Sequence, residues 1–189
     1  MKLKYIPNIL SVIRIIMVPV FIYLFLNYYE NQIYLSLLVF LLAGLTDVID
    51  GFLARRFNWI TNLGKLLDPF ADKLMQCSVL ICFTIKGFIP LWLVILFLFR
   101  ELFMICGGLI VLKKIKITVK SNWYGKGTTA VFYAIAFAVF IFKLYGLSIK
   151  WVNAVLFALA LILALLSMVM YIIDTLNINE ELKKSGKTN

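Results

Sequence analysis

The chain has 189 residues, of which 63% are hydrophobic, and its 19 lysines and arginines outweigh nine acidic residues to give a net charge of +10. So large an apolar share excludes a soluble globular domain and predicts an all-α integral membrane protein, because only helices satisfy the backbone of such runs in lipid. In this apolar background the positive charge favours membrane lipids and phosphorylated substrates as partners and disfavours nucleic acid.

Six apolar segments are long enough to cross a bilayer as transmembrane helices. They cover residues 8–27, 33–54, 67–86, 90–112, 125–145 and 150–173, after a short N-terminal interfacial segment over residues 1–7. Because no flexible linker divides them, we predict one membrane domain over residues 1–176. We expect residues 177–189 to form a polar cytoplasmic tail that is partly disordered.

The cations in the tails, in the connections and at the ends of these segments predict the orientation in the membrane. One side of the six-helix arrangement carries thirteen, namely Lys2, Lys4, Arg55, Arg56, Lys65, Lys113, Lys114, Lys116, Lys120, Lys126, Lys183, Lys184 and Lys187. The other side carries Lys86, Lys143 and Lys150. Since Lys and Arg gather on the cytoplasmic side, we place both termini there, in what we expect to be a bacterial cell membrane.

Several charged residues lie inside the apolar segments, at membrane depth. They include Arg14, Lys73, Arg100 and Glu101, as well as four aspartates. A charge at the bilayer centre costs about 2.5–3.5 kcal/mol, so these side chains should face the interior of the helix bundle. Arg14 and Arg100 are either structural partners for the acids or members of a site.

The four aspartates occur in the stretch "DVIDGFLARRFNWITNLGKLLDPFAD". Asp47 and Asp50 are three residues apart and Asp68 and Asp72 are four apart, so on helices each pair shares one face. A short connection joins the two predicted helices that carry them. The four carboxylates should therefore converge in the cytoplasmic half of the membrane.

Four carboxylates at one point repel each other unless a cation lies among them. The chain has no histidine, and ligation by oxygen alone suits Mg²⁺ or Mn²⁺. Four acids are enough for two such ions, which commonly grip a phosphate or pyrophosphate. Gly51, Ala54 and Gly64 lie beside them and favour close approach of a nucleotide, although small residues also permit tight helix packing.

The order D-x2-D-G-x2-A-R-x8-G-x3-D-x3-D resembles the signature of the CDP-alcohol phosphotransferase family. Every fixed position is present, as Asp47, Asp50, Gly51, Ala54, Arg55, Gly64, Asp68 and Asp72. The similarity continues through "IPNILSVIRIIMVPVF" and "GKLLDPFADKLM", and more weakly through "FRELFM" and "GKGTTAV". It implies a six-helix membrane enzyme, a homodimer, that moves a phosphatidyl group from CDP-diacylglycerol to an alcohol and releases CMP.

The resemblance also implies roles for individual residues. Asp47, Asp50 and Asp68 would coordinate two Mg²⁺ or Mn²⁺ ions, while Asp72 would reach one ion and act as catalytic base toward the acceptor hydroxyl. The nucleotide would contact a set that comprises Asp47, Asp50, Gly51, Ala54, Arg55 and Gly64.

Within the family, the two stretches most resemble phosphatidylglycerophosphate synthases, whose acceptor is glycerol 3-phosphate. Arg100, Lys126 and Lys120 are available to bind its phosphate. Those synthases usually show G-K-x-K-T, whereas this chain has Thr128 in place of the second lysine. Cardiolipin synthases, whose acceptor is phosphatidylglycerol, share the opening motif and are the alternative, and inositol phosphate or another alcohol stays open.

A function from a different class is also compatible with acids inside the membrane, namely a divalent-cation transporter. We disfavour it because the acids gather at one end of the predicted helices instead of crossing the membrane.

Overall fold

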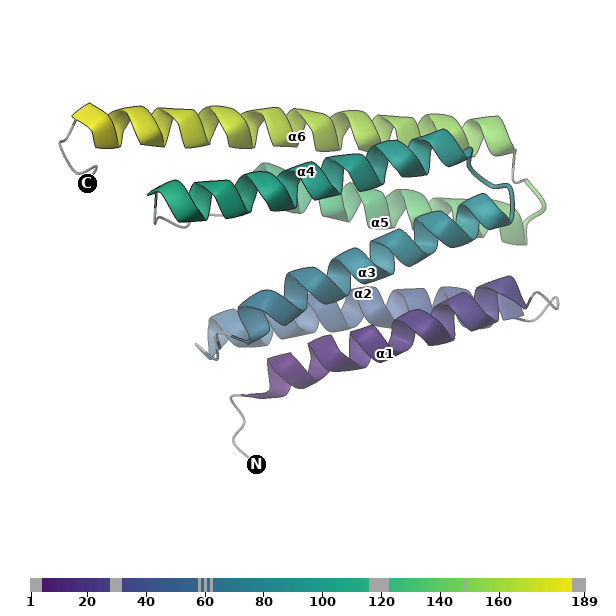
Figure 1. Cartoon of the computed structure of the whole chain (residues 1–189). Helices are drawn as coiled ribbons and strands as arrows, with labels where there is room; N and C mark the ends of the chain where they lie inside the picture. Colours follow the sequence, from purple (N-terminus) through teal and green to yellow (C-terminus); the bar gives the residue numbers. More distant parts are fainter. Residues whose placement is uncertain are drawn as a thin grey trace. The chain divides into compact units, whose positions relative to one another are not determined.

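Leucine, isoleucine and phenylalanine runs form the helices of this protein. Its structure is a computed structural model that describes residues 5–27, 32–57, 59, 61, 63–115, 123–147 and 149–184. In that part of the chain every regular element is helical, which confirms the predicted all-α class. The helices are α1 (Ile6–Leu26), α2 (Gln32–Arg56), α3 (Gly64–Ile85), α4 (Leu91–Ile115), α5 (Trp123–Leu144) and α6 (Lys150–Lys184) (Figure 1).

Four of these helices contain stretches long and apolar enough to cross a membrane, which identifies a membrane protein. The stretches are Ile6–Leu26, Gln32–Ala54, Gly127–Leu144 and Lys150–Asp174. Within the described residues, α3 and α4 contain no stretch that is equally long and apolar. In α3, the aspartates and lysines near the start of the helix reduce its mean hydropathy.

Helix α6 is longer than its apolar run. It continues through the polar stretch to Lys184 and has 35 residues, so it extends past the predicted span of 150–173 and includes residues 177–184 of the predicted polar tail. The stretch "NINEELKK" contains neither glycine nor proline, and Glu, Leu and Lys favour helix. The end of an apolar run is therefore not the end of this helix.

The chain divides into two compact units, each described here by itself. The first unit comprises Met1–Phe88 and Phe140–Leu147, and the second comprises Ile89–Val139 and Ser148–Asn189. In the first unit α1 packs along both α2 and α3, the two helices that carry the aspartates. In the second unit α4 packs against α6.

Aromatic rings form the core of the first unit. The ring of Phe25 in α1 lies 5.5 Å from Phe83, 5.9 Å from Phe88 and 5.6 Å from Phe140, measured between centroids. Phe21 stacks on Phe25 at 5.6 Å. All five side chains are buried. This cluster fixes the second half of α1 and leaves its first half to meet the acidic ends of α2 and α3.

Two of the three cations predicted for the non-cytoplasmic side have partners within the first unit. Lys86 Nζ donates a hydrogen bond of 2.8 Å to the carbonyl oxygen of Leu26, at the C-terminus of α1, where the helix dipole favours a positive charge. Lys143 Nζ lies 5.6 Å from the centroid of the Phe88 ring. Gly87, with φ of +74°, ends α3 beside them in a conformation that suits glycine.

Many predicted cytoplasmic cations fall outside the described side chains, namely Lys2, Lys4, Arg55, Lys65, Lys113, Lys114, Lys116, Lys120, Lys126, Lys183, Lys184 and Lys187. The orientation in the membrane therefore stays a prediction from their sequence positions.

Candidate functional site

The first half of α1 presents a polar face to the two aspartate-bearing helices. Asn8, Ser11 and Arg14 are three residues apart, so they follow one side of the helix. Their exposures are 9%, 0% and 0%. Buried polar groups need partners, and these three find theirs on α2, on α3 and on the connection between them.

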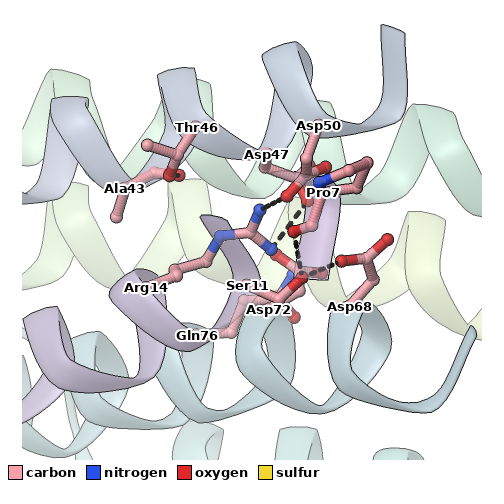
Figure 2. A network of polar contacts seen from close by, with 10 residues as sticks. All are labelled: Pro7, Ser11, Arg14, Ala43, Thr46, Asp47, Asp50, Asp68, Asp72 and Gln76. Atoms are coloured by element: carbon pink, nitrogen blue, oxygen red, sulfur yellow. Dashed lines mark hydrogen bonds and ion pairs between the residues drawn. The ribbon is translucent and has the colours of Figure 1, made fainter. Parts of the chain in front are cut away.

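Arg14 joins the two aspartates of α2. Its Nη1 lies 2.8 Å from Asp47 Oδ1 and its Nη2 lies 2.5 Å from Asp50 Oδ2 (Figure 2). The side chains of Arg14 and Asp50 are buried, with exposures of 0% and 2%, whereas that of Asp47 is 39% exposed. Arg14 is therefore an ion-pair partner of both acids, and Asp47 forms the open side of the cluster.

Ser11 connects the same face of α1 to α3. Its hydroxyl oxygen lies 3.0 Å from the carbonyl oxygen of Pro7 and also forms a hydrogen bond with Asp68 Oδ1 (Figure 2). One hydroxyl proton serves two acceptors, and the charged carboxylate is the stronger one. Three of the four predicted carboxylates, on α2 and α3, therefore contact a single turn of α1.

Asn8 fixes the beginning of α3. Thr61 Oγ1 donates to Asn8 Oδ1 at 2.8 Å and accepts a hydrogen bond of 2.9 Å from the backbone N–H of Gly64. A Cβ atom added at Gly64 would lie 2.6 Å from Asn8 Oδ1 and 3.0 Å from Thr61 Oγ1. A side chain at Gly64 would therefore clash with α1. This supports tight helix packing, which is one of the two reasons predicted for this glycine.

Asp72 is held within its own helix. Gln76 Nε2, one turn further along α3, donates a hydrogen bond of 3.0 Å to Asp72 Oδ2. Gln76 is 8% exposed, and its Oε1 lies 3.5 Å from Lys73 Nζ. The Asp72 side chain is half-buried, so the helix orients this carboxylate without enclosing it.

The residues fit a hard metal ion by their chemistry. Among the described residues, no three His, Cys, Asp or Glu side chains are arranged around one point that could hold an ion. The Arg14 guanidinium supplies the positive charge between Asp47 and Asp50 instead. Carboxylate and hydroxyl oxygens are nevertheless the donors that Mg²⁺ and Mn²⁺ prefer, and with one charge supplied by Arg14 the four acids would need three more positive charges for neutrality.

The predicted nucleotide residues are placed in part. Gly51 and Ala54 are half-buried on α2, in the turn that follows Asp50. The side chain of Arg55 lies outside the described residues.

The predicted acceptor residues are not brought to this cluster by any described contact. Arg100, which belongs to the second unit and is 7% exposed, pairs with Glu101 and donates a 3.2 Å hydrogen bond from Nη2 to the carbonyl oxygen of Ala164. Its Nε has no hydrogen-bond partner among the described residues. The side chains of Lys120 and Lys126 lie outside those residues.

Sequence analysis did not identify Asn8, Ser11, Thr61 or Gln76 as members of the site. A signal for two of them is present, because Asn8, Ser11 and Arg14 are the polar residues of an otherwise apolar helix and recur at a spacing of three. Such a repeat predicts a polar face that is turned toward buried charge. Thr61 and Gln76 carry no comparable signal.

The sequence profile of the family described as CDP-alcohol phosphatidyltransferase matches residues 4–173. A CDP-diacylglycerol–glycerol-3-phosphate 3-phosphatidyltransferase from Aquifex aeolicus is 38% identical over 88% of this chain and 93% of its own length. A probable phosphatidylglycerophosphate synthase from Mycobacterium tuberculosis is 32% identical over 90% of this chain and 81% of its own. A CMP-forming cardiolipin synthase from Streptomyces coelicolor is 46% identical over 51% of this chain and 46% of its own.

Proposed function

The chain belongs to the CDP-alcohol phosphatidyltransferase family, and from that premise we propose that it transfers the phosphatidyl group of CDP-diacylglycerol to glycerol 3-phosphate. The products are phosphatidylglycerophosphate and CMP. We choose this acceptor because of how much of the chain each group of relatives matches. Relatives named for this product match about nine-tenths of the chain, whereas the cardiolipin synthase match spans about half of either protein.

Cardiolipin synthesis, with phosphatidylglycerol as acceptor, is the second candidate. It is favoured by an identity of 46% over about half of the chain, against 38% over the longer match, and by Thr128, where phosphatidylglycerophosphate synthases usually carry a lysine. A divalent-cation transporter is a weaker alternative, because transport gives no role to the glycines and Arg55 of the family signature.

We place the site at the cytoplasmic surface of a bacterial membrane, with all six helices spanning the bilayer and both termini in the cytoplasm. The support is the excess of Lys and Arg in the sequence on the side where the aspartates lie. A site at this depth lets a membrane-bound CDP-lipid and a water-soluble phosphate meet. The homodimer implied by the family resemblance stays a prediction.

In this proposal Asp47, Asp50 and Asp68 would hold two Mg²⁺ or Mn²⁺ ions, and Asp72 would also reach one of them. Bound ions would stabilise the negative charge that develops on the pyrophosphate. Gly51, Ala54, Arg55 and Gly64 line the nucleotide part of the site. Arg100, Lys126 and Lys120 remain the predicted ligands of the acceptor phosphate.

Asp72 is the proposed general base. The acceptor hydroxyl oxygen attacks the phosphorus atom that bears the diacylglycerol group, and its proton passes to Asp72. The bond between that phosphorus and the oxygen bridging to CMP breaks, so CMP leaves with the bonding electron pair. Gln76 supports this step by holding Asp72 Oδ2 and thereby orienting the carboxylate.

The experiment supplies purified full-length protein with CDP-diacylglycerol and Mg²⁺, and adds glycerol 3-phosphate, phosphatidylglycerol or inositol phosphate in separate reactions. We expect CMP release with glycerol 3-phosphate, and phosphatidylglycerophosphate as the lipid product. Release with phosphatidylglycerol alone would establish the cardiolipin alternative. Failure with every acceptor, together with Mn²⁺ uptake into proteoliposomes, would favour transport.

A further inference from the structure

We infer that Arg14 and Ser11 of α1 are positioning residues for the metal-binding carboxylates, an inference that rests on the proposed function. Arg14 contacts Asp47 Oδ1 and Asp50 Oδ2, and Ser11 contacts Asp68 Oδ1. One turn of α1 thus contacts one carboxylate oxygen of each of the three proposed ligands (Figure 2).

The form of these contacts suits orientation. A guanidinium is a rigid planar fork with several N–H donors, so its two Nη atoms can fix two carboxylates at a set separation. Arg14 has 0% exposure, and helix packing keeps its side chain in one place. A carboxylate that is held through one oxygen has a defined rotamer, so its other oxygen points in a defined direction.

The same contact also has a purely electrostatic interpretation, and the two make opposite predictions. If Arg14 only neutralises Asp47 and Asp50, its removal makes the site more negative and a divalent cation should bind more tightly. If Arg14 positions the carboxylates, its removal lets them rotate and separate, and the cation should bind more weakly. Groups that orient metal ligands typically change metal affinity 10–100-fold when they are mutated.

The test measures Mn²⁺ binding to the purified full-length protein in detergent, from the electron paramagnetic resonance signal of free Mn²⁺. Arg14→Gln removes the charge, but it leaves the buried Asp50 without its partner and risks unfolding. Two milder variants therefore accompany it. Arg14→Lys keeps the charge without the fork, and Ser11→Ala removes the hydroxyl beside Asp68. Ser36→Ala is the matched control, because Ser36 is a buried serine in α2 whose hydroxyl donates to the Ile33 carbonyl oxygen.

We expect Mn²⁺ to bind at least tenfold more weakly to Arg14→Lys and severalfold more weakly to Ser11→Ala, at melting temperatures close to wild type. Ser36→Ala should bind Mn²⁺ as the wild type does. Unchanged or tighter binding by Arg14→Lys and Ser11→Ala would overturn the inference while leaving the proposed function intact. A wild-type protein that binds no Mn²⁺ would refute the metal part of the proposed function and the inference with it.

Discussion

Among the four aspartates, Asp72 has a different setting from the other three. Asp47, Asp50 and Asp68 are engaged by side chains of α1, whereas Asp72 accepts a hydrogen bond from Gln76 of its own helix. We propose that Asp47, Asp50 and Asp68 hold the ions and that Asp72, whose Oδ2 is oriented by Gln76, accepts the substrate proton.

Asp72→Asn tests this division because asparagine has nearly the same shape and cannot accept the proton. We expect CDP-diacylglycerol to bind within about threefold of wild type while phosphatidyl transfer falls about a hundredfold or more, the usual contribution of a general base. Lipid binding and CMP release would be measured on the same preparation. Asp174→Asn in α6 is a matched control and should change neither.

A collapse of CDP-diacylglycerol affinity in Asp72→Asn, in parallel with the rate, would show that Asp72 is chiefly a ligand. The base would then have to be found elsewhere in the site.

At the scale of helices, α1 organises the site through one continuous buried face. Phe21 and Phe25 anchor its second half in the aromatic core, and Asn8, Ser11 and Arg14 extend the same face to the acids. At Gly64, Asn8 occupies the space that a Cβ atom would need.

Gly64→Ala should therefore destabilise the protein before any substrate is present. Overpacking of a tight contact costs about 1–3 kcal/mol, which would appear as a lower melting temperature in detergent. Asn8→Ala removes the obstructing oxygen, so the double variant should lose less than the sum of the two single losses. Gly107→Ala is the control, since no described atom lies within 4 Å of a Cβ added there.

If Gly64→Ala keeps the wild-type melting temperature and only weakens CDP-diacylglycerol binding, the packing account is wrong. Gly64 would then serve the nucleotide alone.

The elements show what the sequence could and could not predict. Long apolar runs predicted the helices, and the spacing of Asp47 and Asp50 predicted that they share one face, on which Arg14 contacts both, because both predictions follow from helix periodicity. Ser11 was not predicted, since a serine in an apolar helix commonly bonds the carbonyl four residues back, and Ser11 also lies near Pro7 O. The length of α6 was underestimated because polar helix formers give no stop signal.

At the scale of the whole chain, Arg100 and Lys126 stay predicted ligands of the acceptor phosphate. Arg100 is already paired with Glu101, so Arg100→Ala would leave this half-buried acid without that partner. The melting temperature of this variant must therefore be measured alongside its kinetics. Lys126→Ala is the milder change. We expect Lys126→Ala and Arg100→Ala to raise KM for glycerol 3-phosphate about tenfold or more, equivalent to about 1.4 kcal/mol per decade.

KM for CDP-diacylglycerol should remain near the wild-type value in both variants. Unchanged glycerol 3-phosphate kinetics in both would remove Arg100 and Lys126 from the acceptor site and strengthen the cardiolipin synthase alternative, with Thr128 as its sequence signal.

The most direct test of the account compares metal-dependent CMP release by the wild type with that of Asp47→Asn, Asp50→Asn and Asp68→Asn, each checked for its melting temperature. Carboxamides are poor ligands for Mg²⁺ and Mn²⁺ in place of carboxylates. We predict that excess EDTA abolishes wild-type release, that added Mg²⁺ restores it, and that folded forms of all three variants release CMP at least a hundredfold more slowly. Near-wild-type release in EDTA, or by any of the three variants, would contradict the assignment of these aspartates as the metal-binding centre.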